Sequence, residues 1–263
     1  MTNIITIFFY LAAWAYLLHR MLRRERFSTN KIMLLIGLGL LAHASTLYTS
    51  MATEGGIQLG FFKVALLFFF VINLLVLVSS TKKPLHNLFV FLLPLSIVGL
   101  LVGQIFDSPL TKDNQLTPSL IAHILLSVLA YSLLTIASLQ ALLLAYQSRQ
   151  LKRKHFHGIM GLMPPLQTME TLLFELVWAG FVFLSLSILT GVIFIDDIFA
   201  QKLSHKTVFS ILSWGTYAVL LSGRHSLGWR GPSAIRWVLG GFAALMLAYF
   251  GSKFVLEVLL AGR

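Results

Sequence analysis

The chain has 263 residues, of which 57% are hydrophobic and only 11% are charged, and its formal net charge is +11. Soluble domains carry about 25% charged residues, so this composition excludes a soluble enzyme, a DNA-binding module and a disordered tail. The chain has no cysteine, which excludes disulfide bonds, thiolate ligation of a metal or heme, and thiol–disulfide chemistry by the chain itself.

Apolar runs long enough to cross a membrane follow one another along the whole chain. A transmembrane helix needs about 20 apolar residues, and eight runs approach or exceed this length. They lie at residues 3–19, 31–50, 61–80, 86–106, 118–147, 170–195, 206–222 and 234–260. The short alternating segments typical of transmembrane strands do not occur. We therefore predict an all-α polytopic helix bundle that is embedded in the lipid bilayer. It is expected to form a single transmembrane domain over residues 1–263.

Lys and Arg are distributed unevenly between alternate connections of these runs. Fourteen of them flank the connections after the first, third, fifth and seventh runs, and six lie on the other side. Cytoplasmic connections carry the excess of basic residues, which predicts that both termini face outward. Because the basic residues flank apolar runs, they indicate membrane orientation, and no nucleic-acid partner is expected.

With no cysteine and few acidic residues, the chain offers its eight histidines as the main candidate metal ligands. His43 lies inside the second run, His123 lies just inside the outer end of the fifth, and His205 opens the seventh on the same side. His225 lies at the cytoplasmic end of the seventh run. Ionisable residues at membrane depth are functional candidates by default, so we predict that His43, His123 and His205 meet near the outer leaflet. The alternative for each is a hydrogen-bonded packing role.

The ligand chemistry favours heme over zinc. Imidazole suits both metals, but a tetrahedral zinc site needs three or four ligands with closely spaced pairs, and no run contains such a pair. Heme needs one or two axial histidines and a broad apolar wall. We therefore predict heme b, with His123 and His43 as candidate iron ligands and His205 as a further binding residue. The other ring nitrogen of His123 is expected to bond to Ser127 or to a carbonyl of a neighbouring helix.

Two acidic residues enter the sixth run from the cytoplasmic side. Glu170 is expected at the membrane interface, where a carboxylate near a helix start faces the positive end of the helix dipole. Glu175 lies deeper and is expected to pair with an Arg such as Arg224, with a proton-relay role as the alternative.

Four strings, in this order along the chain, carry a family resemblance. They are His123-Ile-Leu-Leu-Ser-Val-Leu-Ala-Tyr131, Met163-Pro-Pro-Leu with Leu-Thr190-Gly191, Gly223-Arg-His225 with Gly228-Trp229-Arg230-Gly231, and Ala248-Tyr249-Phe250-Gly251. The combination resembles the cytochrome c assembly family, which includes the heme-handling component of system II and its HemX-like relatives. The resemblance is greatest to the small eight-span, YpjD-like branch of the bacterial inner membrane, and it covers about residues 30–263.

The resemblance implies heme handling. His123 matches the family histidine that serves as an outward-facing axial ligand, and His225 matches the histidine thought to hold heme on its way across the membrane. The resemblance therefore implies His225 as a further candidate iron ligand, at a second, inner site. Two family features are missing: residues 196–206 contain no Trp where synthetase-type members have a Trp-rich external segment, and residues 254–263 contain no second external histidine. Either His43 or His205 then supplies the sixth ligand, or heme is five-coordinate, or this branch keeps the fold without heme.

Two functions follow from these observations, and no enzymatic activity is expected under either. The first is heme trafficking or cytochrome c assembly, with heme and an apocytochrome c as partners. The second is a non-enzymatic accessory subunit that positions or regulates another membrane protein. A transporter is disfavoured because the runs hold few charges and show no pair of Gly- or Pro-broken helices in matching halves.

Overall fold

The computed structural model describes residues 2–23, 28–53, 56–57, 61–105, 117–153, 163–194 and 204–251. These residues form eight α-helices, one 3-10 turn, one π-helical turn and a pair of very short strands. The helices divide into two compact units. Unit 1 comprises Met1–Leu116 and Gln150–Pro165, and unit 2 comprises Thr117–Arg149 and Leu166–Arg263.

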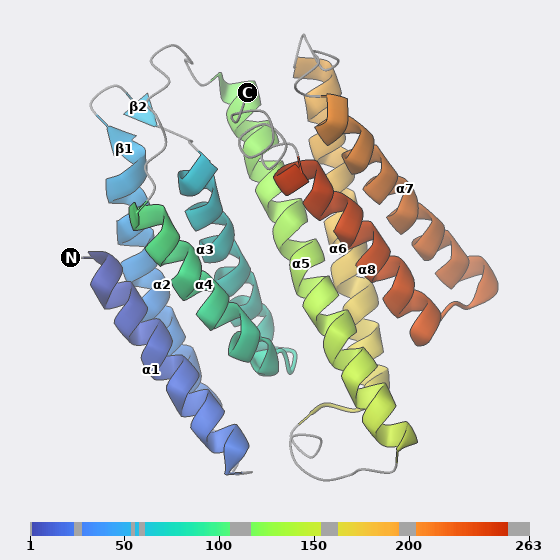
Figure 1. Ribbon diagram of the computed structural model, residues 1–263, viewed down its shortest axis with the longest axis horizontal. Coiled ribbons are helices and arrows are strands. Elements are labelled where there is room, and N and C mark those ends of the chain that lie inside the picture. Colours follow the sequence, from blue (N-terminus) through green and yellow to red (C-terminus); the bar gives the residue numbers. More distant parts are fainter. Residues whose placement is uncertain are drawn as a thin grey trace, which may run out of the picture. The chain divides into compact units, whose positions relative to one another are not determined.

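Unit 1 is built from the first four helices (Figure 1), which are α1 (Thr2–Leu22), α2 (Thr29–Met51), α3 (Phe61–Ser80) and α4 (Phe89–Ile105). Helix α1 packs against α2 and α4, and α3 packs against the same two helices. The connection between α2 and α3 contains the antiparallel strands β1 (Ala52–Thr53) and β2 (Gly56–Ile57). A 3-10 turn, η1 (His86–Leu88), leads into α4.

A proline inside α4 is compensated by a side chain from α1. Pro94 has no backbone N–H, so it cannot donate to the carbonyl of Val90 one turn earlier. The indole N–H of Trp14 donates to that carbonyl at 3.0 Å. Because a bilayer offers no water to an unpaired backbone group, this hydrogen bond both satisfies the carbonyl and ties α1 to α4.

Unit 2 is built from the last four helices, which are α5 (Pro118–Lys152), α6 (Leu166–Phe194), α7 (Ser204–Leu227) and α8 (Pro232–Met246), followed by the π-helical turn η3 (Leu247–Gly251). Helix α7 packs against α6 and α8. Gly241 of α8 permits this approach, because a Cβ there would lie 2.8 Å from the buried ring of Tyr217 on α7. The Ser213 hydroxyl of α7 also donates to the Gly241 carbonyl at 2.8 Å.

Seven helices in the described part of the chain are long and apolar enough to cross a membrane. The predicted all-α polytopic membrane bundle is therefore confirmed. Helix α7 occupies the seventh predicted run but does not reach the same apolar content. Its polar side chains bond to neighbouring helices, as Ser213 does with α8 and as the Trp214 indole does with the Ser185 hydroxyl of α6 at 2.9 Å.

The helices keep the order of the predicted runs, with shifted ends. Helix α5 continues to Lys152, and α6 already begins at Leu166. Polar and basic residues at the membrane surface do not stop a helix, so apolar content underestimates its length. The eighth predicted run extends to residue 260, but residues 252–263 lie outside the described part of the chain.

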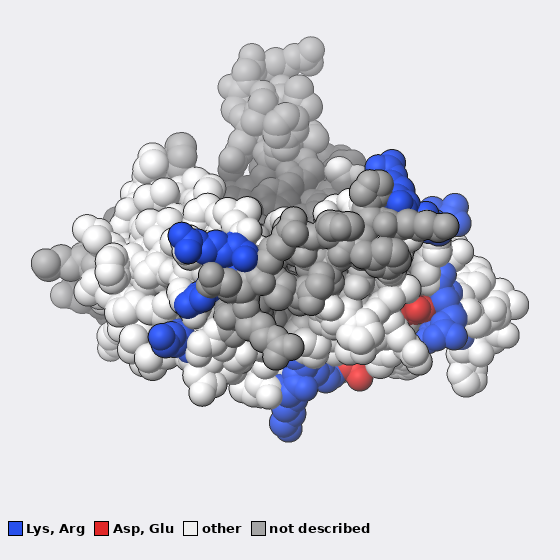
Figure 2. Space-filling model, turned by 90° about the horizontal axis from the view of Figure 1, so that it is seen from below, with Lys and Arg blue, Asp and Glu red and all other residues white. Residues whose placement is uncertain are grey.

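Basic side chains gather where the sequence predicts the cytoplasmic side. Most of the coloured side chains on the face shown in Figure 2 are Lys and Arg, and Asp and Glu show at few places. Within unit 1, Lys82 and Lys83 follow the end of α3, and within unit 2, Arg224 and Arg230 flank the turn after α7. The outward orientation of both termini and the single-domain organisation stay predictions.

Candidate functional site

The structure distributes the candidate histidines over the two units. His43 lies on α2 in unit 1, whereas His123 on α5 and His225 on α7 lie in unit 2. His205 is the second residue of α7, and its side chain lies outside the described part of the chain. The hypothesis that His43 and His123 bind the same heme joins residues of two units, so it stays a prediction.

The imidazole of His43 is part of the core of unit 1. It is fully buried, and its Nδ1 lies 3.1 Å from the phenolic oxygen of Tyr10 on α1. The rings of Tyr10 and Phe70 pack edge-on against it, with centroids 5.9 and 5.6 Å away. Its Nε2 is buried without a well-formed hydrogen bond to any described residue, although the Leu66 backbone of α3 makes a polar contact with the ring. This enclosure supports the packing interpretation of His43.

A glycine makes the contact between Tyr10 and His43 possible. A Cβ at Gly39, one turn before His43 on α2, would lie 2.6 Å from two ring atoms of Tyr10. A larger residue would therefore push the Tyr10 ring away from α2. Gly39 thus allows α1 and α2 to approach closely enough for the hydrogen bond that occupies His43.

His123 is held differently, between α5 and α6 in unit 2. It lies in the second turn of α5 and is half-buried. Its Nδ1 is 2.9 Å from the backbone carbonyl oxygen of Ser187 and 3.2 Å from the hydroxyl oxygen of Thr190, both on α6. Its Nε2 forms no hydrogen bond to another described residue, and it is not among the buried polar atoms that lack a partner. One nitrogen of this half-buried ring is therefore fixed by α6, while the other has no hydrogen-bond partner among the described residues.

Ser127, one turn further along α5, reinforces this contact. Its hydroxyl donates to the backbone carbonyl of His123 at 2.7 Å and lies 2.7 Å from the hydroxyl of Ser187. The prediction that a carbonyl of a neighbouring helix holds His123 is confirmed by Ser187. The alternative partner, Ser127, is wrong, because its hydroxyl bonds to a backbone carbonyl and to Ser187 instead of the imidazole.

On α6, Gly191 provides the space into which the His123 ring of α5 packs. A Cβ at this position would lie 3.1 Å from Cε1 and 3.5 Å from Nδ1 of His123. The first distance is shorter than an ordinary van der Waals contact, so even alanine would displace the ring slightly. The sequence contained this signal in the string Leu-Thr190-Gly191, but no pattern linked it to His123.

His225 is exposed and lies two residues before the end of α7. Because α5 begins and α7 ends at opposite ends of unit 2 (Figure 1), His123 and His225 lie near opposite ends of this unit, as predicted. The residues that the structure describes contain no cluster of three His, Asp or Glu side chains that would hold a metal ion.

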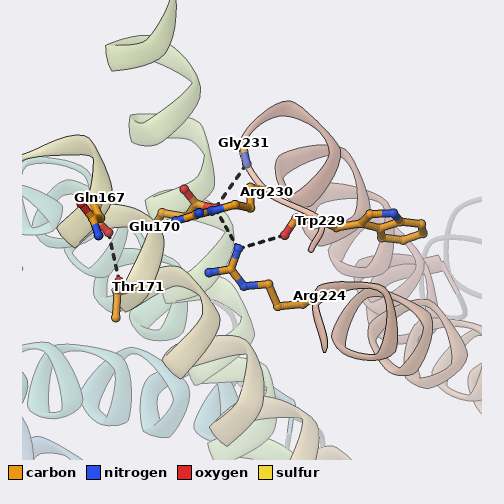
Figure 3. Close-up of polar contacts among 7 residues, drawn as sticks. All are labelled: Gln167, Glu170, Thr171, Arg224, Trp229, Arg230 and Gly231. Carbon is orange, nitrogen blue, oxygen red and sulfur yellow. Dashed lines mark hydrogen bonds and ion pairs between the residues drawn. The ribbon is translucent and has the colours of Figure 1, made fainter. Parts of the chain in front are cut away.

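A second polar site joins α6 to the turn between α7 and α8 (Figure 3), and we call it the Glu170 corner. The Glu170 side chain is only 9% exposed, and its Oε1 lies 3.3 Å from Nη1 of Arg224 and 3.4 Å from Nε of Arg230. The backbone N–H of Gly231 donates to the same oxygen at 3.4 Å. One carboxylate between two guanidinium groups leaves this corner with a positive charge.

The Glu170 corner fixes the start of α8. Gly231 is the residue before the helix, its φ of 52° favours glycine, and it has no side chain to cap the helix. The Glu170 carboxylate of α6 takes the place of a capping side chain, because it accepts the Gly231 N–H and faces the positive end of the α8 dipole. Arg224 donates to the carbonyl of Trp229 at 3.1 Å, and its guanidinium carbon lies 4.4 Å from the ring centroid of Phe174. The turn between α7 and α8 is therefore attached to α6 at several points.

The sequence predicted a different partner for Arg224. It assigned Glu175 to this arginine and Glu170 to the start of its own helix, whereas the ion pair of Arg224 is formed with Glu170. Glu175 follows Glu170 by five residues, about 140° around α6, and Glu175 is exposed whereas Glu170 is buried. Helical spacing separates the two acids but does not say which one faces the turn between α7 and α8. The missed signal is Gly231-Pro232, a helix start with no capping side chain of its own.

The sequence was also compared with those of known proteins. The family described as "Cytochrome C assembly protein" matches residues 32–260. The inner membrane protein YpjD of Escherichia coli strain K12 is 31% identical over 228 residues, which are 84% of this chain and 85% of YpjD. An uncharacterized 28.8 kDa protein of Azospirillum brasilense is 35% identical over 140 residues, 52% of each chain.

A cytochrome c biogenesis protein, CcsA of Prochlorococcus marinus, is 30% identical over 91 residues, which are 34% of this chain and 29% of CcsA. No solved structure matches the chain. The family match extends from α2 past the end of α8, and the YpjD match also covers most of both chains. The chain therefore belongs to the cytochrome c assembly protein family and is a multi-pass protein of the bacterial inner membrane.

Proposed function

We propose that this protein binds heme through His123 and takes part in heme trafficking or cytochrome c assembly as a binding protein, without catalysing a reaction. The supporting observation is the state of the His123 imidazole, which is half-buried, is held by α6 through Nδ1, and has no partner for Nε2 among the described residues. Heme supplies an iron atom whose axial positions accept an imidazole nitrogen. Ligating histidines usually donate their other N–H to a carbonyl or carboxylate, and the Ser187 carbonyl fits this requirement.

The other candidate histidines differ in how well they suit ligation. His43 is enclosed by aromatic rings, so we propose that it packs the helices of unit 1. His205 lies in the first turn of α7, and α5 and α7 begin at the same end of unit 2 (Figure 1). We therefore propose His205 as the second axial ligand beside His123. We propose that the exposed His225 is part of a second heme-binding site at the other end of the unit.

An absorption spectrum of the purified protein tests this proposal. Protein from heme-replete cells, oxidised and then reduced with dithionite, is expected to show a Soret band that His123→Ala removes. The matched control is His19→Ala, which changes an exposed histidine at the end of α1 and is expected to keep the band. Protein that purifies colourless and does not bind added hemin would refute the proposal.

An accessory role is the second candidate, and a sequence observation favours it. Residues 196–206 carry no Trp, although the family resemblance associates heme attachment with a Trp-rich external segment. Under this alternative, His123→Ala leaves the cellular phenotype unchanged, whereas substitutions on the packing face of α8 abolish it. Complementation of a deletion strain by the two kinds of variant separates the candidates.

A further inference from the structure

We infer that α6 holds His123 in the tautomer that is protonated at Nδ1, so that Nε2 carries the free lone pair, and that Thr190 and Gly191 position the ring. The inference rests on the proposed function only where it identifies the ligand of Nε2 as heme iron. The tautomer and the positioning residues are properties of the heme-free protein.

The Ser187 carbonyl determines the tautomer. A carbonyl oxygen only accepts hydrogen bonds, and it lies 2.9 Å from Nδ1 of His123. If Nδ1 were unprotonated, two lone pairs would face each other at this distance in an apolar environment. The protonated nitrogen of a neutral histidine is set by such contacts, so Nδ1 carries the hydrogen.

Thr190 supports the same assignment. Its hydroxyl oxygen lies 3.0 Å from the carbonyl of Leu186 and 2.9 Å from that of Ser187, so its single hydrogen is used within α6. The lone pairs of this oxygen then remain for the N–H of His123 at 3.2 Å. Nδ1–H therefore has two acceptors on one helix, and both stabilise the same ring orientation.

The hydroxyl groups of Ser127 and Ser187 fix the spacing between the helices. The Ser127 hydrogen is donated to the His123 carbonyl, so the hydrogen between the two serine oxygens belongs to Ser187. Ser187 thus contacts α5 twice, through its hydroxyl and through its carbonyl. Gly191 also limits the position of the His123 ring, because the ring packs against the space that a Cβ at this position would crowd.

Two variants of α6 and a matched control test the positioning roles. Gly191→Ala is expected to weaken hemin binding by about tenfold, because partners that orient a ligating histidine contribute about 10–100-fold in affinity. Thr190→Val keeps the shape of the side chain, removes one acceptor and is expected to have a smaller effect in the same direction. Gly215→Ala on α7 is the control, because a Cβ there meets nothing within 4 Å, and it is expected to bind hemin like the unchanged protein.

Nitrogen NMR of the heme-free, ¹⁵N-histidine-labelled protein in nanodiscs tests the tautomer, with His123→Asn used to assign the signal. We expect a protonated Nδ1 and an unprotonated Nε2. A protonated Nε2 overturns the inference whether or not hemin binds. The expected tautomer in a protein that binds no hemin supports the inference and refutes heme as the ligand. Hemin binding by Gly191→Ala that equals the control, with an unchanged tautomer, overturns the role assigned to Gly191.

Discussion

Unit 1 and unit 2 each place a histidine between two helices beside a glycine, and the two histidines end in opposite states. In unit 1, Gly39 admits the Tyr10 ring, which closes over His43 and occupies its Nδ1. In unit 2, Gly191 admits the His123 ring itself, and the partners of Nδ1 are a backbone carbonyl and a hydroxyl group. His43 is fully buried because its glycine lies against a second aromatic ring, whereas His123 stays half-buried because its glycine lies against the imidazole itself.

The largest expected effect on stability is that of His43→Ala. Removing a fully buried ring leaves a cavity between Tyr10 and Phe70, and we expect a loss of about 3 kcal/mol in the free energy of unfolding. Steric-trapping measurements in bicelles give this value. The same variant is expected to bind hemin normally if His43 only packs, so a lost Soret band would erase the distinction between the two histidines.

Gly39→Ala is expected to cost about 2 kcal/mol, because overpacking of a filled core typically costs 1–3 kcal/mol. Gly191→Ala is expected to cost clearly less in stability, since the half-buried His123 ring has room to move, while it weakens hemin binding. Unfolding of the two variants under identical conditions compares them directly. Equal losses of stability would mean that the contact between Gly191 and the His123 ring is as tightly packed as the core of unit 1.

Glu170→Gln tests whether unit 2 is stabilised by its charged corner instead of its histidine. The amide keeps one acceptor for Gly231 but removes the charge between Arg224 and Arg230, both of which are partly exposed. We expect a loss of about 1–2 kcal/mol, less than for a fully buried ion pair. The control Arg236→Gln changes an exposed arginine of α8 and is expected to stay within about 0.5 kcal/mol. Hemin binding at His123 is expected to persist in both variants.

The smallest expected effect is that of Trp14→Phe in unit 1. The ring is largely retained, but the Val90 carbonyl freed by Pro94 loses its donor. Polar contacts between membrane helices are worth about 0.6 kcal/mol on average, and we expect a loss of this order. The combined variant Trp14→Phe with Pro94→Ala restores a backbone donor within α4 and is expected to cost less than Trp14→Phe alone.

The candidate site was only partly predictable from the residues. His123 was identified because an ionisable group at membrane depth is costly and therefore informative. The difference between His43 and His123 was not, since both lie inside apolar runs with similar neighbours along the chain. Glu170 and Glu175 both lie near the start of α6, so the choice of Arg224's partner depended on where the turn between α7 and α8 lies in space.

The sequence by itself determined the membrane class, the all-α fold, the order of the helices and the family, because apolar length and local motifs are properties of contiguous residues. Only the tertiary structure decided which polar groups meet. The carbonyl freed by Pro94 is paired by Trp14, which lies 76 positions from Val90 in the chain, and the Nδ1 of His123 is paired by Ser187, 64 positions away. Such contacts depend on helix rotation and close approach at glycines. No periodicity within a single helix encodes them.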